Sequence, residues 1–162
     1  PTGRTFMSKK IFVILDNIRS VENTGSTFRT SDGAGVSKIY LCGTTPTPID
    51  RFGRARKDFA KVSLGAEKTV PWEHAKNTKD IIARLKEENV QVVAVEQDKK
   101  AIDYKKLKAG GAIAFVFGNE VSGVSKDILS LCDEIVEIPM KGAKESLNVS
   151  VAAGIILFSA SA

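Results

Sequence analysis

Three short segments of the chain contain side chains that could bind a ligand and take part in a reaction. They are residues 23–29 with Asn23, Gly25 and Arg29, residues 118–123 with Gly118, Glu120 and Gly123, and residues 138–150 with Ile138, Met140, Ser146, Leu147 and Asn148. Amide, carboxylate and hydroxyl groups can contact a ligand's donors and acceptors, a guanidinium can hold a phosphate, and glycines allow close approach to the backbone. These three segments are therefore the candidate site.

Each segment also has a local structural explanation. Ser125 is expected to cap the helix that follows residues 118–123, and a carboxylate such as Glu120 is favoured electrostatically at the start of a helix. Ser146 occupies a plausible helix N-cap position, and Arg29 could be an ordinary surface arginine. The sequence has no GxGxxG fingerprint and no GK[ST], which argues against a nucleotide-dependent oxidoreductase on an ordinary dinucleotide-binding sheet and against a P-loop.

Short apolar runs alternate with helical patterns along the chain. The runs, expected to be buried strands, are residues 10–15, 38–42, 91–95, 112–117 and 134–138, and the expected helices are residues 24–32, 78–88, 126–131 and 147–159. This alternation predicts an α/β domain with a mostly parallel sheet and helices on both faces. Ligands bind beyond the carboxyl ends of such strands, and each candidate segment begins where an apolar run stops.

Size and composition indicate one domain, residues 1–162, with no separate RNA-binding extension. The 43% hydrophobic content is enough for a core, and Cys42 and Cys132 lack metal-ligand spacing, so they read as small buried hydrophobes and we expect no metal site. No apolar run approaches membrane-spanning length, so we expect no membrane association and a cytoplasmic protein.

A basic cluster lies within the longest stretch that is expected to be irregular, residues 43–71. Its cations are interleaved with Phe52 and Phe59, and they are Arg51, Arg54, Arg56, Lys57 and Lys61. Such a cluster attracts phosphate, and charge alone is equally compatible with a solvated basic loop. His74 is the only histidine, and its position after Trp72 suggests a surface loop without a chemical role.

Taken together, in this order and at this spacing, the three segments resemble the three motifs of the SpoU-type RNA ribose 2′-O-methyltransferases of the SPOUT superfamily. Asn23, Gly25 and Arg29 match the first motif, residues 118–123 the second, and residues 138–153 the third. Residues 63–67 before residues 70–72 also resemble a segment of the branch that includes ribose methylases of transfer RNA. The resemblance covers about residues 12–158.

The resemblance implies a C-terminal deep trefoil knot, although general topology rules disfavour knots. It also implies S-adenosylmethionine as methyl donor, held by Gly118, Ile138, Met140, Ser146 and Leu147. Relatives work as homodimers in which the first motif reaches the site across the subunit interface. The nearly all-apolar residues 149–158 suit a helix buried against both the sheet and a partner, and equally an internal core helix.

The implied reaction is methylation of a ribose 2′-hydroxyl in transfer or ribosomal RNA. The implied catalytic residues are Arg29, Asn23, Glu120, Ser146 and Asn148. Because a guanidinium stays protonated in proteins, we expect Arg29 to grip a phosphate and stabilise the developing alkoxide, and not to act as the base. The basic cluster is expected to contact RNA, with its two phenylalanines available for stacking on bases. The alternative is a non-catalytic RNA-binding protein of the same fold.

Overall fold

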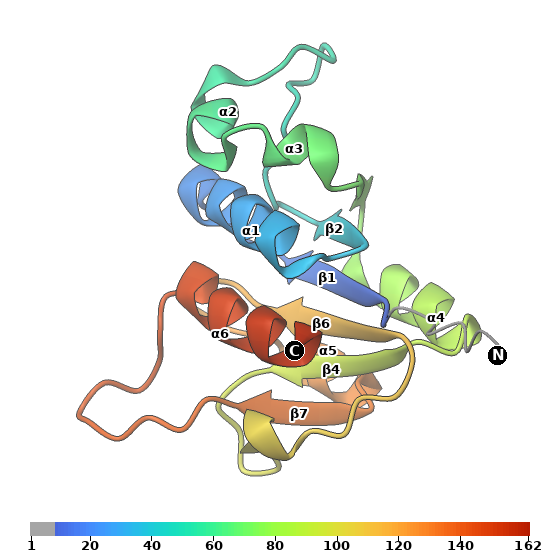
Figure 1. Ribbon diagram of the computed structural model, residues 1–162, viewed down its shortest axis with the longest axis vertical. Helices are drawn as coiled ribbons and strands as arrows, with labels where there is room; N and C mark the ends of the chain where they lie inside the picture. Colours follow the sequence, from blue (N-terminus) through green and yellow to red (C-terminus); the bar gives the residue numbers. More distant parts are fainter. Residues whose placement is uncertain (1–8) are drawn as a thin grey trace, which may run out of the picture.

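The structure is a computed structural model that describes residues 9–162. All seven strands in this part of the chain form one parallel sheet, in the order β3-β2-β1-β6-β4-β7-β5 (Figure 1). The strands are β1 (Ile11–Asp16), β2 (Lys38–Cys42), β3 (Trp72–Ala75), β4 (Gln91–Val95), β5 (Ile102–Asp103), β6 (Ile113–Phe117) and β7 (Glu134–Glu137). The predicted α/β class is confirmed.

The central strands have continuous apolar sequences because helices cover both faces of the sheet. Every residue of β6 is buried, and the apolar side chains of β1 alternate between two separate core clusters. One cluster lies under α1 (Val21–Ala34) and α6 (Val149–Ser161), together with side chains of α2 (Lys57–Ser63) and α3 (Ala66–Thr69). The other lies under α4 (Thr78–Glu87) and α5 (Lys126–Leu131).

The position of β7 brings three loops to one place. Although β4 and β5 are joined only by residues 96–101, β7 lies between them in the sheet. The loops that follow β4, β6 and β7 therefore emerge at neighbouring carboxyl ends. The trefoil knot stays a prediction, which this strand order accommodates.

Side-chain caps fix the helix starts near these loops. Ser125 accepts a hydrogen bond from the amide of Ile128, as expected for the N-cap of α5. The expected N-cap at Ser146 is wrong: α6 begins at Val149, and the Asn148 side chain caps it by accepting from the amide of Ser150. Ser146 lies two residues upstream, in the loop.

The prediction of an irregular stretch over residues 43–71 is also wrong. It contains α2 and α3, and a turn in which Asp50 accepts hydrogen bonds from the amides of Phe52 and Arg54. Strands β3 and β5 and a short 3₁₀ helix, η1 (Tyr104–Lys106), were not expected either. His74 is exposed but belongs to β3, where its Nε2 lies 3.1 Å from the Gly43 carbonyl oxygen.

The burial of Phe59 corrects the expectation that both phenylalanines of the basic cluster can stack on bases, and burial also explains the state of the two cysteines. Phe59 is fully buried and packs edge-to-face on Phe28 at a ring-centroid distance of 5.4 Å, so it cannot stack on a base. Phe52 remains 65% exposed. Burial raises the pKa of the Cys42 thiol to about 12 and that of the half-buried Cys132 to about 11, so both stay protonated as small, unreactive groups.

We predict that replacing the two phenylalanines of the basic cluster changes the stability of the protein to very different extents. Phe59→Ala should lower the free energy of unfolding by about 3–5 kcal/mol because it empties a core position against Phe28. Phe52→Ala should change it by less than about 1 kcal/mol, as is usual for surface positions. Urea unfolding of both variants measures this, and equal losses would contradict the assignment of Phe59 to the core.

Candidate functional site

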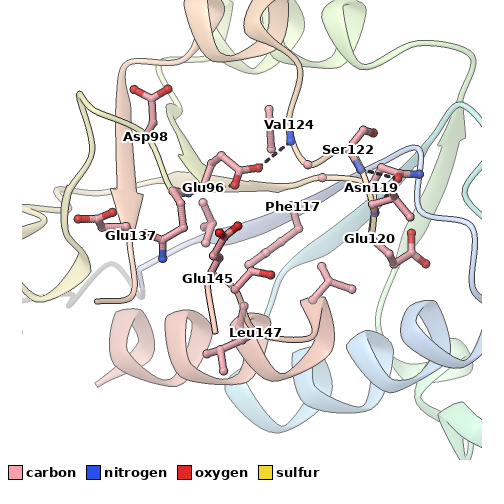
Figure 2. Close-up of a pocket in the computed structure, with 18 of the residues that line it drawn as sticks. Glu96, Asp98, Phe117, Asn119, Glu120, Ser122, Val124, Glu137, Glu145 and Leu147 are labelled. Atoms are coloured by element: carbon pink, nitrogen blue, oxygen red, sulfur yellow. Dashed lines mark hydrogen bonds between the residues drawn. The ribbon is translucent and has the colours of Figure 1, made fainter. Parts of the chain in front are cut away.

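A cavity of about 800 Å³ lies at the carboxyl ends of β4, β6 and β7. Its walls are residues 95–98 at the end of β4, residues 117–126 at the end of β6, and residues 137, 138, 140 and 145–149 between β7 and α6, with Asn23 of α1 at one side. Figure 2 shows Glu96, Glu120, Glu145 and Leu147 arranged around this space. The three predicted segments thus meet at the sheet edge where a parallel sheet binds ligands.

Glu120 joins the second segment to the start of α1. Its carboxylate accepts hydrogen bonds from the amides of Arg19 at 3.0 Å and Ser20 at 2.9 Å, and from the Asn23 side-chain amide at 3.3 Å. Desolvation alone would raise the pKa of Glu120, but these hydrogen bonds outweigh it and hold the pKa below its ordinary value. Glu120 is therefore a carboxylate at neutral pH, and it stabilises α1 and not the helix that follows it in sequence.

Asn23 connects Glu120 to the third segment. The Asn148 side-chain nitrogen donates to Asn23 Oδ1 at 3.1 Å, while Asn148 Oδ1 accepts from the amide and the hydroxyl of Ser150. The hydrogen-bonded series Glu120–Asn23–Asn148 thus crosses the cavity wall from the β6 loop to α6. Side chains separated by 97 and 125 residues in the sequence hold one another in fixed orientations.

The turn after β6 is closed by its own residues. Asn119 accepts from the amides of Val121 and Ser122 and donates to the Asn17 carbonyl at 2.8 Å, which ties the turn to the end of β1. A Cβ on Gly118 would lie 2.4 Å from the backbone of Gly123 and Val124. Gly118 is therefore required by close backbone packing within the turn.

Sequence reasoning missed two residues that hold the cavity loops together. Glu96 accepts from the amide of Val124 at 2.8 Å (Figure 2). Gln97 donates to the Ile138 carbonyl at 2.9 Å. The loop after β4 thus fixes the loops after β6 and β7. The available signal was the position of these polar residues directly after the buried run 91–95, which is the place where the other candidate residues were found.

All five residues expected to bind a cofactor line the cavity, namely Gly118, Ile138, Met140, Ser146 and Leu147. Of those expected to be catalytic, Asn23, Glu120, Ser146 and Asn148 also line it. Arg29 does not: it is exposed on α1, away from the cavity of its own chain. The structure therefore brings four of the five predicted catalytic residues together and leaves the arginine apart.

The basic cluster lies outside the cavity, around the turn that precedes α2. Arg54 pairs with Asp50 at 3.3 Å and Arg56 with Asp58 at 2.7 Å, so two of its cations are partly neutralised. The guanidinium groups of Arg51 and Arg54 lie over the exposed Phe52 ring at 4.8 and 4.9 Å. Lys57 and Lys61 are exposed on α2.

Residues 9–162 contain neither a membrane-spanning helix nor a cluster of metal ligands. No helix there is long and apolar enough to cross a membrane. No group of three or more histidine, cysteine, aspartate or glutamate side chains in that range could hold a metal ion.

Comparison with known proteins agrees with this geometry. Residues 10–158 match the sequence profile of the SpoU rRNA Methylase family. The chain belongs to the SpoU rRNA methylase family. It is 34% identical over 154 residues to the 23S rRNA (guanosine-2′-O-)-methyltransferase RlmB of Escherichia coli K12, covering 95% of this chain and 60% of that protein. The RlmB of Vibrio vulnificus is 33% identical over 150 residues, covering 93% and 58%. This SpoU family member thus spans about three fifths of these relatives.

Solved structures of RNA-modifying enzymes have the same fold. An AdoMet-bound rRNA methyltransferase from Sinorhizobium meliloti superposes with a TM-score of 0.83 at 31% identity, covering 93% of this chain and 55% of that one. The TrmH/SpoU tRNA modifying enzyme of A. aeolicus superposes with a TM-score of 0.82 at 30% identity, covering 94% and 74%.

We predict that Gly123→Ala destabilises the protein through Glu96. Gly123 has a φ of +68°, and an added Cβ would lie 2.2 Å from Glu96 Oε2. Backbone strain alone costs on the order of 1–3 kcal/mol. Moving the Glu96 carboxylate away from the added Cβ would also break its hydrogen bond to the Val124 amide. Urea unfolding should therefore show a larger loss than for Gly111→Ala, where φ is +54° but the space is open, and no loss for Gly142→Ala, where no neighbour is close.

The contact with Glu96 can be isolated with a double variant. Gly123→Ala should cost less in a Glu96→Ala background than in the wild type, because that background has already lost the hydrogen bond to the Val124 amide and the collision is absent, while the strain remains. Equal losses for Gly123→Ala and Gly111→Ala would contradict a role of Glu96 in requiring this glycine.

Proposed function

We propose that this chain carries the catalytic site of an S-adenosylmethionine-dependent RNA ribose 2′-O-methyltransferase. The observation that carries the proposal is the cavity wall on which Glu120, Asn23 and Asn148 are hydrogen-bonded to one another. Family membership supports the same reaction class, because the curated relatives are named as guanosine-2′-O-methyltransferases. The proposal concerns the part of those longer proteins that this chain matches.

The cavity fits the proposed cofactor in size and charge. A volume of about 800 Å³ is within the usual range for small-molecule sites. Five carboxylates but only one lysine, Lys126, are among the lining side chains, which favours a ligand with cationic groups. When bound, S-adenosylmethionine would supply a methyl group on a positively charged sulfur. Gly118, Ile138, Met140, Ser146 and Leu147 would contact it.

The side chains on the cavity wall would orient the ribose. Asn23 and Asn148 fix each other, so an amide group of either can present a donor or acceptor in a constant position. Glu120 would hold Asn23 and the substrate side of the cavity, with Ser146 beside it. An arginine would bind the neighbouring phosphate and stabilise the developing 2′-alkoxide, while the hydroxyl proton passes to phosphate or water.

We further propose that Arg29 acts in the cavity of a second copy of the chain. In its own chain it is exposed on α1 and does not line the cavity. Beside α1, the apolar helix α6 leaves Val151 and Phe158 51% and 52% exposed, and a partner subunit could cover both side chains. A symmetric dimer that covers this surface would account for both features.

The turn that precedes α2 is the proposed contact for RNA backbone. Arg51, Arg54, Arg56, Lys57 and Lys61 surround it, and Phe52 is the aromatic ring accessible to a base. The curated relatives favour ribosomal RNA as the first substrate to test, while the sequence resemblance of residues 63–72 favours transfer RNA. We propose a cytoplasmic location, which is compatible with either RNA substrate and with the two free cysteines.

A non-catalytic RNA-binding protein of the same fold is the alternative. It would retain the basic turn but would have no need for a polar network on the wall of a cofactor-sized cavity. The continuous series from Glu120 to Asn148 therefore favours catalysis.

We predict that the protein transfers a methyl group from labelled S-adenosylmethionine to RNA. After incubation with separate ribosomal and transfer RNA pools, nuclease digestion should place the label in a ribose-methylated nucleotide. Arg29→Ala should reduce transfer by roughly a hundredfold or more, as for other groups that stabilise developing charge, and leave cofactor affinity unchanged. Cofactor binding without transfer to either pool would favour the alternative.

We predict that two inactive variants restore activity when mixed. Asn148→Asp keeps the N-cap acceptor of α6 but loses the donor to Asn23. If Arg29 acts across a dimer, a mixed dimer of Arg29→Ala and Asn148→Asp contains one intact site, and transfer should recover to about a quarter of the wild-type value. No recovery after subunit exchange, verified by co-purification of two tags, would mean that Arg29 acts within its own chain.

A further inference from the structure

The segment that follows the cavity loop of β4 carries a second group of lysines. Five exposed lysines occur within ten residues, and we refer to them as the lysine edge: Lys99, Lys100, Lys105, Lys106 and Lys108. They surround β5, which is the outermost strand of the sheet next to β7 (Figure 1, the yellow segment). The basic turn before α2 belongs to the connection between β2 and β3, which are at the opposite end of the strand order.

The five lysines of the lysine edge outnumber the acidic residues of the same segment. Asp98 and Asp103 are the only acidic residues between positions 98 and 108, and both accept hydrogen bonds from backbone amides, of Lys100 at 2.8 Å and Lys105 at 3.0 Å. Among residues 9–162, none of the ion pairs involves a lysine of this edge. The ammonium groups are therefore available to an external anion.

The apolar residues of the same segment point inward. Ile102, Tyr104 and Leu107 are partly buried and pack against the core under α1 and α6. The surface that remains is made of flexible cations without exposed aromatic or aliphatic anchors. Protein interfaces usually have such anchors at their centre, whereas a phosphate backbone is bound mainly by lysine and arginine charges.

The lysine edge is continuous with the mouth of the cavity. Gln97 and Asp98 line the cavity immediately before Lys99. Across the cavity, Met140 and Glu145 also line it, and the exposed Lys141 and Lys144 lie between them in the chain. An RNA strand whose ribose entered the cavity would therefore have lysines along its path toward β5.

We propose that the lysine edge is a second RNA-backbone contact surface, which extends from the cavity mouth along β5. The inference rests on the proposed function, because it takes the RNA to be positioned by the cavity. The competing explanation is that lysines protect the outer strand from pairing with other sheets, which would need no RNA.

The test compares two variants of equal charge change. Lys105→Gln/Lys106→Gln removes two ammonium groups that do not line the cavity. Lys79→Gln/Lys86→Gln is the matched control on α4, where these lysines already face Asp127 at 3.8 Å and Asp133 at 3.6 Å. Binding of a fluorescent 20-nucleotide single-stranded RNA is measured from low to moderate salt, with S-adenosylmethionine affinity and light scattering in the same preparations.

The lysine-edge variant should bind RNA about tenfold more weakly, and the slope of log affinity against log salt should fall by about 1.4 if both phosphate contacts are lost. The control variant should match the wild type, and neither variant should change cofactor affinity. Equal RNA affinity and slope in both variants would overturn the inference, and aggregation of the lysine-edge variant with unchanged RNA affinity would identify edge protection instead. Wild-type protein that binds RNA without transferring methyl groups would contradict the proposed function, not this surface.

Discussion

The carboxylate of Glu120 is the group on which the geometry of the cavity depends. It meets two backbone amides at the start of α1, where the helix dipole favours a negative charge, and these contacts offset the cost of desolvating it. Because the same carboxylate holds Asn23, and Asn23 holds Asn148, one residue orients side chains on α1 and α6. Helices that already pack side by side over the sheet are thereby joined at the ends that face the cavity.

The turn after β6 is constrained as strongly by its glycines as by its hydrogen bonds. Gly118 is required because the backbone of Gly123 and Val124 crosses directly over it, and Gly123 because the Glu96 carboxylate occupies the space of a side chain. Glu96 also accepts from the amide of Val124, so the same contact that excludes a Cβ holds the turn closed. The glycine pattern of this segment thus has a folding cause that needs no ligand.

The sequence predicted the parts of this arrangement that depend on local pattern. Residues 38–42, 91–95 and 126–131 form the expected elements because buried parallel strands and a capped helix have clear sequence signals. Strands β3 and β5 were missed because they are short and their pairing depends on distant residues. Arg29 is six residues after Asn23, which places it about 120° away around α1 at 3.6 residues per turn. The helical period therefore predicts that Arg29 and Asn23 point in different directions, so that both cannot face the cavity of one chain.

Negative side chains line the cavity, whereas the two clusters of positive side chains lie outside it. Inside, carboxylates of Glu96, Asp98, Glu137 and Glu145 repel one another, and a cationic ligand relieves that repulsion. The same carboxylates would repel a phosphate, so in the proposed reaction the RNA backbone would be held by cations outside the cavity. The basic turn and the lysine edge lie on opposite sides of the cavity in the strand order, as this division requires. In the proposed reaction, a ribose would then reach the interior while its two flanking phosphates stay at the rim.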